Sequence, residues 1–182
     1  LNNDLARLLK DTFDTNDKVN ITFKAKEGMG SVDGIKSFTE YKNGVFNTTI
    51  DLNADVLKYA TQEYILVTMY HEFIHAYLSY QVSTLPYDQY TAKFPKVSEY
   101  EVKDSNGNII KKYALIKDHK NYGSFIESLK NSIISFNPVI TSSYAEALAK
   151  NGIVESLTEN ESKINRNERD TRNNEYKGKK CP

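Results

Sequence analysis

The chain has 182 residues, of which 39% are hydrophobic, enough to close a single core. Its 24 lysines and arginines balance its 24 aspartates and glutamates, so no overall charge draws it to nucleic acid or to an anionic membrane. It has no apolar run long enough for a membrane span, and its single cysteine, Cys181, excludes an internal disulfide and a cysteine-rich zinc ribbon.

The first predicted elements are a short helix and a half-buried strand. Apolar residues at helical spacing predict a helix over residues 5–13, and alternating apolar residues predict a strand over residues 19–25. Residues 28–34 are rich in glycine but lack the Lys-Ser/Thr ending of a phosphate-binding loop. We therefore interpret them as a turn.

A β-hairpin follows, with strands over residues 35–41 and 45–52. Lys42-Asn43-Gly44 separates the strands, and Asn-Gly is a strong signal for a tight hairpin turn. From chain order alone, we expect the strand 45–52 to be the edge strand beside the next helix. A peptide could then add to that edge by backbone pairing.

Residues 61–80 have the pattern of one amphipathic helix. They contain neither Gly nor Pro, and apolar residues recur at helical spacing along one stripe. Thr61 is the predicted N-cap, and Leu85-Pro86 is the predicted end. This helix carries the sequence His71-Glu72-Phe73-Ile74-His75, which is an HExxH motif.

The motif places two imidazoles on one face of the helix, one turn apart. This spacing suits chelation of one Zn²⁺ ion by His71 and His75, and Glu72 can take a proton from a metal-activated water. A catalytic zinc site needs a third protein ligand and one open position. The sequence therefore predicts a further ligand elsewhere in the chain.

Three residues downstream are candidates for that third ligand. His119, the only other histidine, is predicted to open a second amphipathic helix that extends to residue 136, and we favour it as the softer zinc ligand. Glu127 and Glu146 remain alternatives on predicted helices. The metzincin pattern is excluded, because Leu78 and Gln81 stand where it requires Gly and His.

Between the two predicted ligand helices lies an insertion over residues 86–117. It contains a second hairpin, with strands over 99–103 and 109–115, which either roofs the cleft or decorates the surface. A further helix is expected over residues 141–151, closed by Gly152.

We expect a single domain over residues 1–160 and a polar, basic tail over 161–182. Basic residues outnumber acidic ones between Lys163 and Lys180, a composition typical of a solvated tail. The chain starts with Leu1, from which we expect a processed form or part of a longer polypeptide, either in a bacterial cytoplasm or exported.

The run ILVTMYHEFIHAYL at residues 65–78 resembles the active-site helix of SprT-like zinc metallopeptidases, and its His-Ala-Tyr-Leu ending is the specific part. The likeness extends over residues 45–136. It implies an α+β, zincin-like fold, in which a small mixed or antiparallel sheet packs on the HExxH helix and on a second zinc-ligand helix. It also implies that His119 is the third ligand. Lys120 departs from the family pattern, which often has Gly there, and many relatives lack the insertion.

The predicted function is zinc-dependent hydrolysis of peptide bonds. One Zn²⁺ ion is held by His71, His75 and His119, Glu72 is the general base, and the substrate is a protein or peptide. Tyr122 and Tyr70 are candidates for an oxyanion donor. Two alternatives stay open: a zinc-stabilised binding module without turnover, and a SprT-like protease acting on DNA-associated proteins, with the basic tail contacting nucleic acid.

Overall fold

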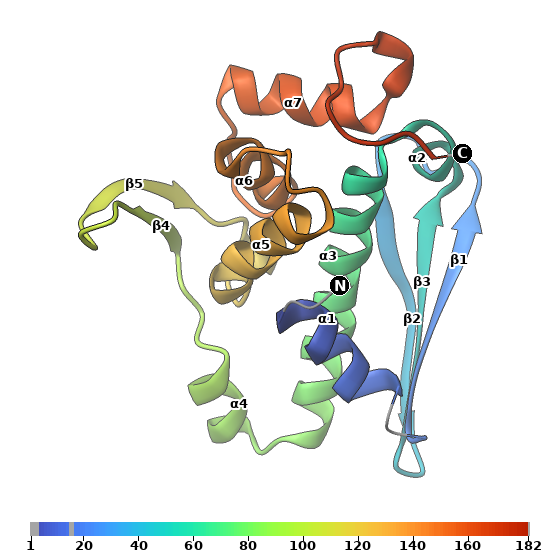
Figure 1. The fold of residues 1–182 in the computed structure, drawn as a ribbon. Helices are drawn as coiled ribbons and strands as arrows, with labels where there is room; N and C mark the ends of the chain where they lie inside the picture. Colours follow the sequence, from blue (N-terminus) through green and yellow to red (C-terminus); the bar gives the residue numbers. More distant parts are fainter. Residues whose placement is uncertain (1–3, 15–16, 182) are drawn as a thin grey trace.

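The computed structural model describes residues 4–14 and 17–181, which form an α+β fold (Figure 1). The long helix α3 (Gln62–Thr84) lies between a three-stranded sheet on one side and helices α5 (Ile126–Phe136) and α6 (Ser142–Lys150) on the other. Helix α7 (Glu159–Arg169) packs on α6 and on the first half of α3. The predicted α+β class is confirmed.

The sheet contains β1 (Val19–Lys26), β2 (Gly34–Lys42) and β3 (Val45–Asn53), in the order β1-β3-β2. Strand β3 pairs parallel with β1 and antiparallel with β2. The predicted hairpin is confirmed. Asn43 and Gly44 form its turn with φ values of 52° and 77°, as a tight turn with two left-handed residues requires.

The expectation that residues 45–52 form the edge strand is wrong. Strand β3 is central and pairs on both sides, whereas β2 is an edge strand and is the one that runs beside α3. The difference arises because β1 enters the sheet parallel to β3, across a connection that local patterns do not specify. The free edge beside the motif helix therefore belongs to β2.

The chain's first helix is confirmed in the described residues. Helix α1 (Asp4–Leu9) continues into a π-helical turn over Lys10–Asp14, and Leu5 is buried against the core. A short helix that the pattern did not predict, α2 (Ala54–Tyr59), follows β3. The Asn53 side chain caps it by accepting from the Asp55 backbone N–H.

Helix α3 is buried on nearly all sides. The Thr61 side chain accepts from the Tyr64 backbone N–H at its start, and the helix ends at Thr84, before Leu85-Pro86, as predicted. Every residue from 61 to 81 is buried or half-buried. The prediction of a single buried stripe is wrong, because the sheet covers one face of α3 while α5 and α6 cover another.

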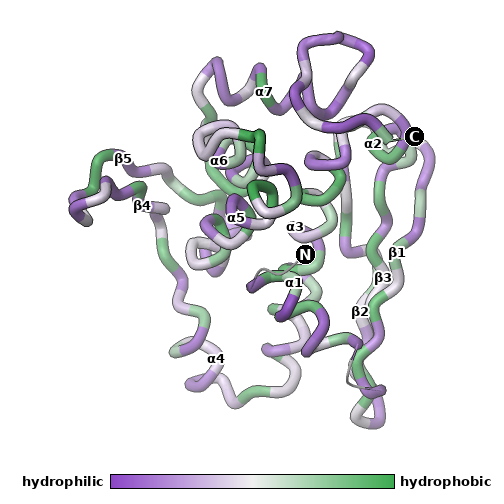
Figure 2. Tube along the Cα trace, in the orientation of Figure 1, coloured by the Kyte–Doolittle hydropathy of each residue, from purple (hydrophilic) through white to green (hydrophobic). Residues whose placement is uncertain are grey.

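Hydropathy follows these layers (Figure 2). Hydrophobic residues gather where α3, α5 and α6 meet, and hydrophilic residues dominate α7 and the chain after it. Leu129, Ile133 and Leu148 are at most 1% exposed in this core. None of the described helices is both long enough and apolar enough to cross a membrane.

The insertion over residues 86–117 forms α4 (Tyr87–Lys93) and a hairpin of β4 (Glu99–Lys103) and β5 (Ile109–Ala114). The predicted hairpin is confirmed, and its tip projects away from the body (Figure 1). Its base is anchored by two buried tyrosines. The Tyr100 hydroxyl donates to Glu127, and the Lys150 amine lies 3.8 Å from the centre of the Tyr113 ring.

The expectation of a solvated tail is wrong for residues 163–180. Thr158 and Glu161 form a capping box that starts α7, and this helix carries the buried Glu168. After it, residues 176–180, which we name the C-terminal clasp, lie along the start of α3. The Gln62 backbone N–H donates to the Lys179 carbonyl at 2.7 Å.

The clasp satisfies two buried carboxylates. Glu63 accepts from the Lys179 backbone N–H at 2.7 Å, and Glu168 accepts from the Gly178 backbone N–H at 3.1 Å. Both glutamates have 0% exposure, and an unpaired buried carboxylate would cost several kcal/mol. The clasp therefore stabilises the N-terminal end of α3, the helix that carries the HExxH motif.

We predict that Gly178→Ala destabilises the fold. A Cβ atom at this position would lie 2.3 Å from Glu63 Oε2, 2.5 Å from Glu168 Oε2 and 2.7 Å from Thr61 Cβ. Overpacking of this kind costs about 1–3 kcal/mol in the free energy of unfolding, which denaturant titration measures. The control is Lys163→Ala, on the exposed face of α7. Equal unfolding midpoints for Gly178→Ala and wild type would contradict the role of the clasp.

Candidate metal centre

Three histidines come together on one side of α3. His71, His75 and His119 each offer a ring nitrogen, and these atoms all lie within 4.8 Å of one another. The ring centres of His71 and His75 are 5.1 Å apart, and each is 4.9 Å from that of His119. Among the described residues, this is the one group of metal-ligating side chains with such convergence.

His119 reaches the other two from a tight turn and not from a helix. It ends the 3-10 turn Lys117–His119, whereas α5 begins only at Ile126, so the prediction that His119 opens a helix is wrong. The backbone N–H of His119 donates to the Ile116 carbonyl, and the His119 carbonyl accepts from the backbone N–H of Tyr122, both at 2.8 Å. These two hydrogen bonds, each between residues three positions apart, tighten the backbone and turn the imidazole toward α3.

Burial keeps the imidazoles neutral near pH 7. Burial, followed by the neighbouring histidines, lowers the pKa of His71 to about 3 and the pKa of His75 to about 4. Burial also lowers the pKa of His119. Neutral imidazole is the form that ligates a metal, so the site needs no deprotonation step to accept one.

Two of the ring nitrogens are spaced nearly as they would be at a tetrahedral ion. Nitrogens bound to zinc at about 2.0–2.1 Å with tetrahedral angles stand about 3.3 Å apart. His119 Nε2 lies 3.1 Å from His71 Nε2. His119 Nδ1 is buried without a hydrogen-bond partner among the described residues, so the environment of this ring leaves a polar atom unsatisfied. Three neutral nitrogens, and no carboxylate, are a donor set that suits zinc.

Neither alternative third ligand belongs to the group. Glu127 accepts from the Tyr100 hydroxyl and pairs with Lys130. Glu146 pairs with the fully buried Lys150. Both carboxylates thus stabilise the contact between the hairpin and the helices, and they lie outside the histidine group.

Glu72 lies next to the histidines and contacts the edge strand β2. Glu72 is 6% exposed. Burial raises the pKa of its carboxyl to about 7, although a hydrogen bond from the Lys36 backbone acts to lower this pKa. Gly34 allows this close approach, because a Cβ atom there would lie 2.7 Å from Glu72 Cγ. The strand and the carboxylate can therefore meet only where residue 34 lacks a side chain.

The two candidate oxyanion donors are both buried, and Tyr122 is already hydrogen-bonded. The buried Tyr122 hydroxyl donates to the His71 carbonyl oxygen at 3.1 Å, which ties the His119 turn to α3. Burial, followed by the charge of Glu72, raises the pKa of Tyr122 well above its ordinary value. Tyr70 is buried in the core, 6% exposed. Tyr122 thus positions the site through the backbone.

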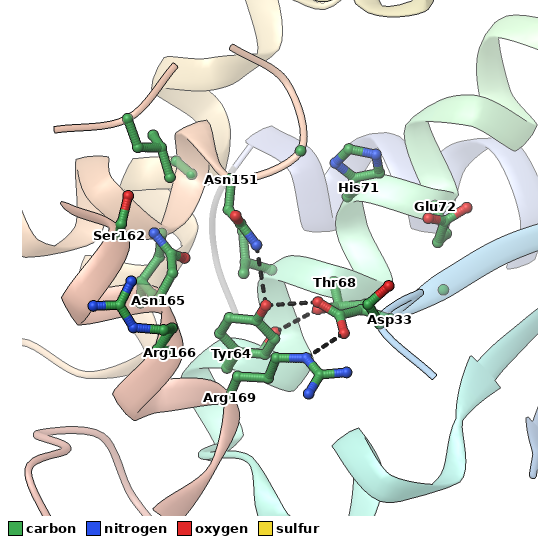
Figure 3. A pocket seen from close by; sticks show the side chains of 17 residues that line it. Asp33, Tyr64, Thr68, His71, Glu72, Asn151, Ser162, Asn165, Arg166 and Arg169 are labelled. Atoms are coloured by element: carbon green, nitrogen blue, oxygen red, sulfur yellow. Dashed lines mark hydrogen bonds and ion pairs between the residues drawn. The ribbon is translucent and has the colours of Figure 1, made fainter. Parts of the chain in front are cut away.

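A cavity of about 600 Å³ adjoins the centre on the side of Glu72. Its wall includes His71 and Glu72 from α3, Gly34 at the start of β2, and residues of α6, α7 and the loop between them (Figure 3). The insertion over residues 86–117 contributes no residue to this wall. The hairpin therefore does not roof the cavity in this structure, which favours the alternative of a surface hairpin.

One polar network at the cavity was not foreseen. Asp33 accepts from Arg169 Nε and from the Tyr64 hydroxyl, both at 2.6 Å, and Asn151 donates to the same hydroxyl at 3.0 Å (Figure 3). It joins the loop before β2 to α3, α6 and α7. Residues 33 and 169 are too far apart in sequence for any spacing rule to pair them, but the glycine-rich 28–34 segment was a signal for close backbone approach.

The chain matches a known protein family over its first 100 residues. The family model described as the SprT-like family matches residues 1–100, which include His71, Glu72 and His75 but not His119. No curated protein and no solved structure matches the chain. The family is associated with zinc and is compatible with protease activity. Since the match covers more than half of the sequence, in agreement with the resemblance of its motif helix, the chain belongs to the SprT-like family.

Proposed function

We propose that this protein is a zinc-dependent metallopeptidase in which His71, His75 and His119 hold one Zn²⁺ ion and Glu72 is the general base. The observation that carries the proposal is the convergence of three neutral imidazoles beside a buried carboxylate at the wall of a cavity. A cavity that reaches Glu72 has room for a substrate, which favours an enzyme over a binding module without turnover.

The bound ion would supply a polarised water and a Lewis acid for the peptide carbonyl. The residues of the chain perform the proton transfers. The Glu72 carboxylate takes a proton from the attacking water and passes it to the leaving nitrogen. A pKa of about 7 suits both steps, because the group can accept and return a proton near neutral pH. The hydrogen bond from the Tyr122 hydroxyl to the His71 carbonyl holds the turn that carries His119 against α3.

The proposed site for the substrate backbone is the free edge of β2. The backbone N–H of Lys36, in this strand, donates a hydrogen bond to the Glu72 carboxylate, so this edge faces the general base. Ile35 and Phe38 on the same strand are 46% and 50% exposed. A peptide that adds to this edge as a further strand would run past Glu72, with backbone pairing for affinity and side-chain contacts for selection. The zincin-like arrangement of strand and helix is part of this proposal.

We predict that Glu72→Gln keeps zinc and loses hydrolysis. Glutamine preserves the size of the side chain and leaves the three imidazoles unchanged, but it cannot accept the proton. The expected result is one zinc per chain by elemental analysis and a loss of casein digestion of at least about 100-fold. Wild-type digestion by the zinc-loaded variant would contradict the role of Glu72.

Gly34→Ala is expected to lower kcat without removing the metal. The added methyl group would displace the Glu72 side chain, and small misplacements of a catalytic group cost up to about 100-fold in rate. The zinc content should stay at the wild-type value. Ser37→Ala, on the same strand, is the matched control and should retain kcat. If Gly34→Ala turns over as fast as this control, the close contact between Gly34 and Glu72 has no catalytic importance.

A further inference from the structure

The wall of the cavity opposite the motif helix is formed by α7. Arg166 and Ser162 from this helix line the cavity, and His71 and Glu72 line its other end (Figure 3). Residues of α7 lie beyond the part of the chain that the family model matches. This wall is therefore a feature of this chain for which the family match gives no role.

The charged side chains of the wall differ in whether they have an ion-pair partner. The Asp33 carboxylate is paired with Arg169 at 2.6 Å, and Arg169 also donates to the Gly30 carbonyl at 3.0 Å. Arg166 is exposed and, among the described residues, takes part in no ion pair or side-chain hydrogen bond. Asp170, the residue that directly follows α7, is paired with Arg172 and does not neutralise Arg166. Arg166 is thus the free cation of the wall.

The groups beside Arg166 suit an anionic ligand. Ser162 precedes it by four residues on the same helix, so a hydroxyl and a guanidinium occupy neighbouring positions on the face toward the cavity. A guanidinium binds carboxylates through two parallel N–H groups, and a hydroxyl can donate a third hydrogen bond. The cavity volume of about 600 Å³ accommodates an acidic side chain together with the adjoining peptide.

We propose that the α7 wall, with Arg166 as its determining residue, is a specificity subsite that takes an acidic side chain of the peptide substrate. The inference rests on the proposed peptidase function, and it assigns the recognition of substrate sequence to α7. The chain binds the acidic residue on the α7 side of the cavity while Glu72 acts on the scissile bond at the other end.

The test uses the full chain with zinc and a set of fluorogenic peptides. Glu, Gln, Lys and phosphoserine are placed in turn at each position that flanks the scissile bond, and kcat/KM is measured for each. At one position, Glu should be preferred over Gln by about 10-fold or more, since a guanidinium binds a charged carboxylate more strongly than a neutral amide. The phosphoserine peptide distinguishes a carboxylate subsite from a phosphate subsite, and a preference for phosphoserine alone would contradict the proposal.

Variants at position 166 test whether Arg166 causes the preference for an acidic residue in the peptide. Arg166→Ala should reduce the Glu-to-Gln ratio to about one, and Arg166→Glu should invert the preference in favour of Lys. Lys163→Ala is the matched control, because Lys163 pairs with Glu175 and lies outside the cavity wall; it should keep the wild-type ratio. Equal kcat/KM for Glu, Gln and Lys at every position in the wild type, or an unchanged ratio in Arg166→Ala, would overturn the subsite.

Binding separates this inference from the proposed function. The same peptides are titrated against zinc-loaded Glu72→Gln protein and followed by fluorescence anisotropy. An acidic preference in binding that requires Arg166, together with no hydrolysis by the wild type, would overturn the peptidase function and support the subsite. Hydrolysis with no acidic preference in either assay would support the peptidase function and overturn the subsite.

Discussion

The convergence of three imidazoles is the constraint on which the site depends. The helical period of α3 brings His71 and His75 to one face, and the tight turn at residues 117–119 carries His119 to within 3.1 Å of His71. Burial holds all three rings in the neutral form. Three neutral nitrogens at this spacing, beside a buried carboxylate, are the arrangement on which the proposed chemistry rests.

The rest of the fold keeps α3 in place. The helix is enclosed by the sheet and by α5 and α6, and its first turn is held by the C-terminal clasp through Glu63. The matched part of the chain supplies the sheet, the HExxH helix and Glu72, whereas His119 and the α7 wall come from residues beyond 100. Family membership thus accounts for part of the centre, and the other part depends on how this chain continues.

Local patterns in the sequence predict local structure well and long-range placement poorly. The Thr61 cap, the Asn43-Gly44 turn and the HExxH spacing each involve residues a few positions apart, and all three appear as expected. The central place of β3 depends on parallel pairing with β1, which no local pattern encodes. The polar segment after residue 160 is ordered because Glu168 finds its partners in the clasp and at Thr61, contacts between distant segments that composition does not reveal.

The most direct test of the metal centre is anomalous diffraction at the zinc absorption edge from crystals of the zinc-loaded full chain. The expected result is one ion bound by nitrogens of His71, His75 and His119 at about 2.0–2.1 Å. Elemental analysis should show loss of zinc in His119→Ala and retention in Glu127→Gln. An ion coordinated by His71 and His75 with His119 remote from it, or no ion at these residues, would contradict the account.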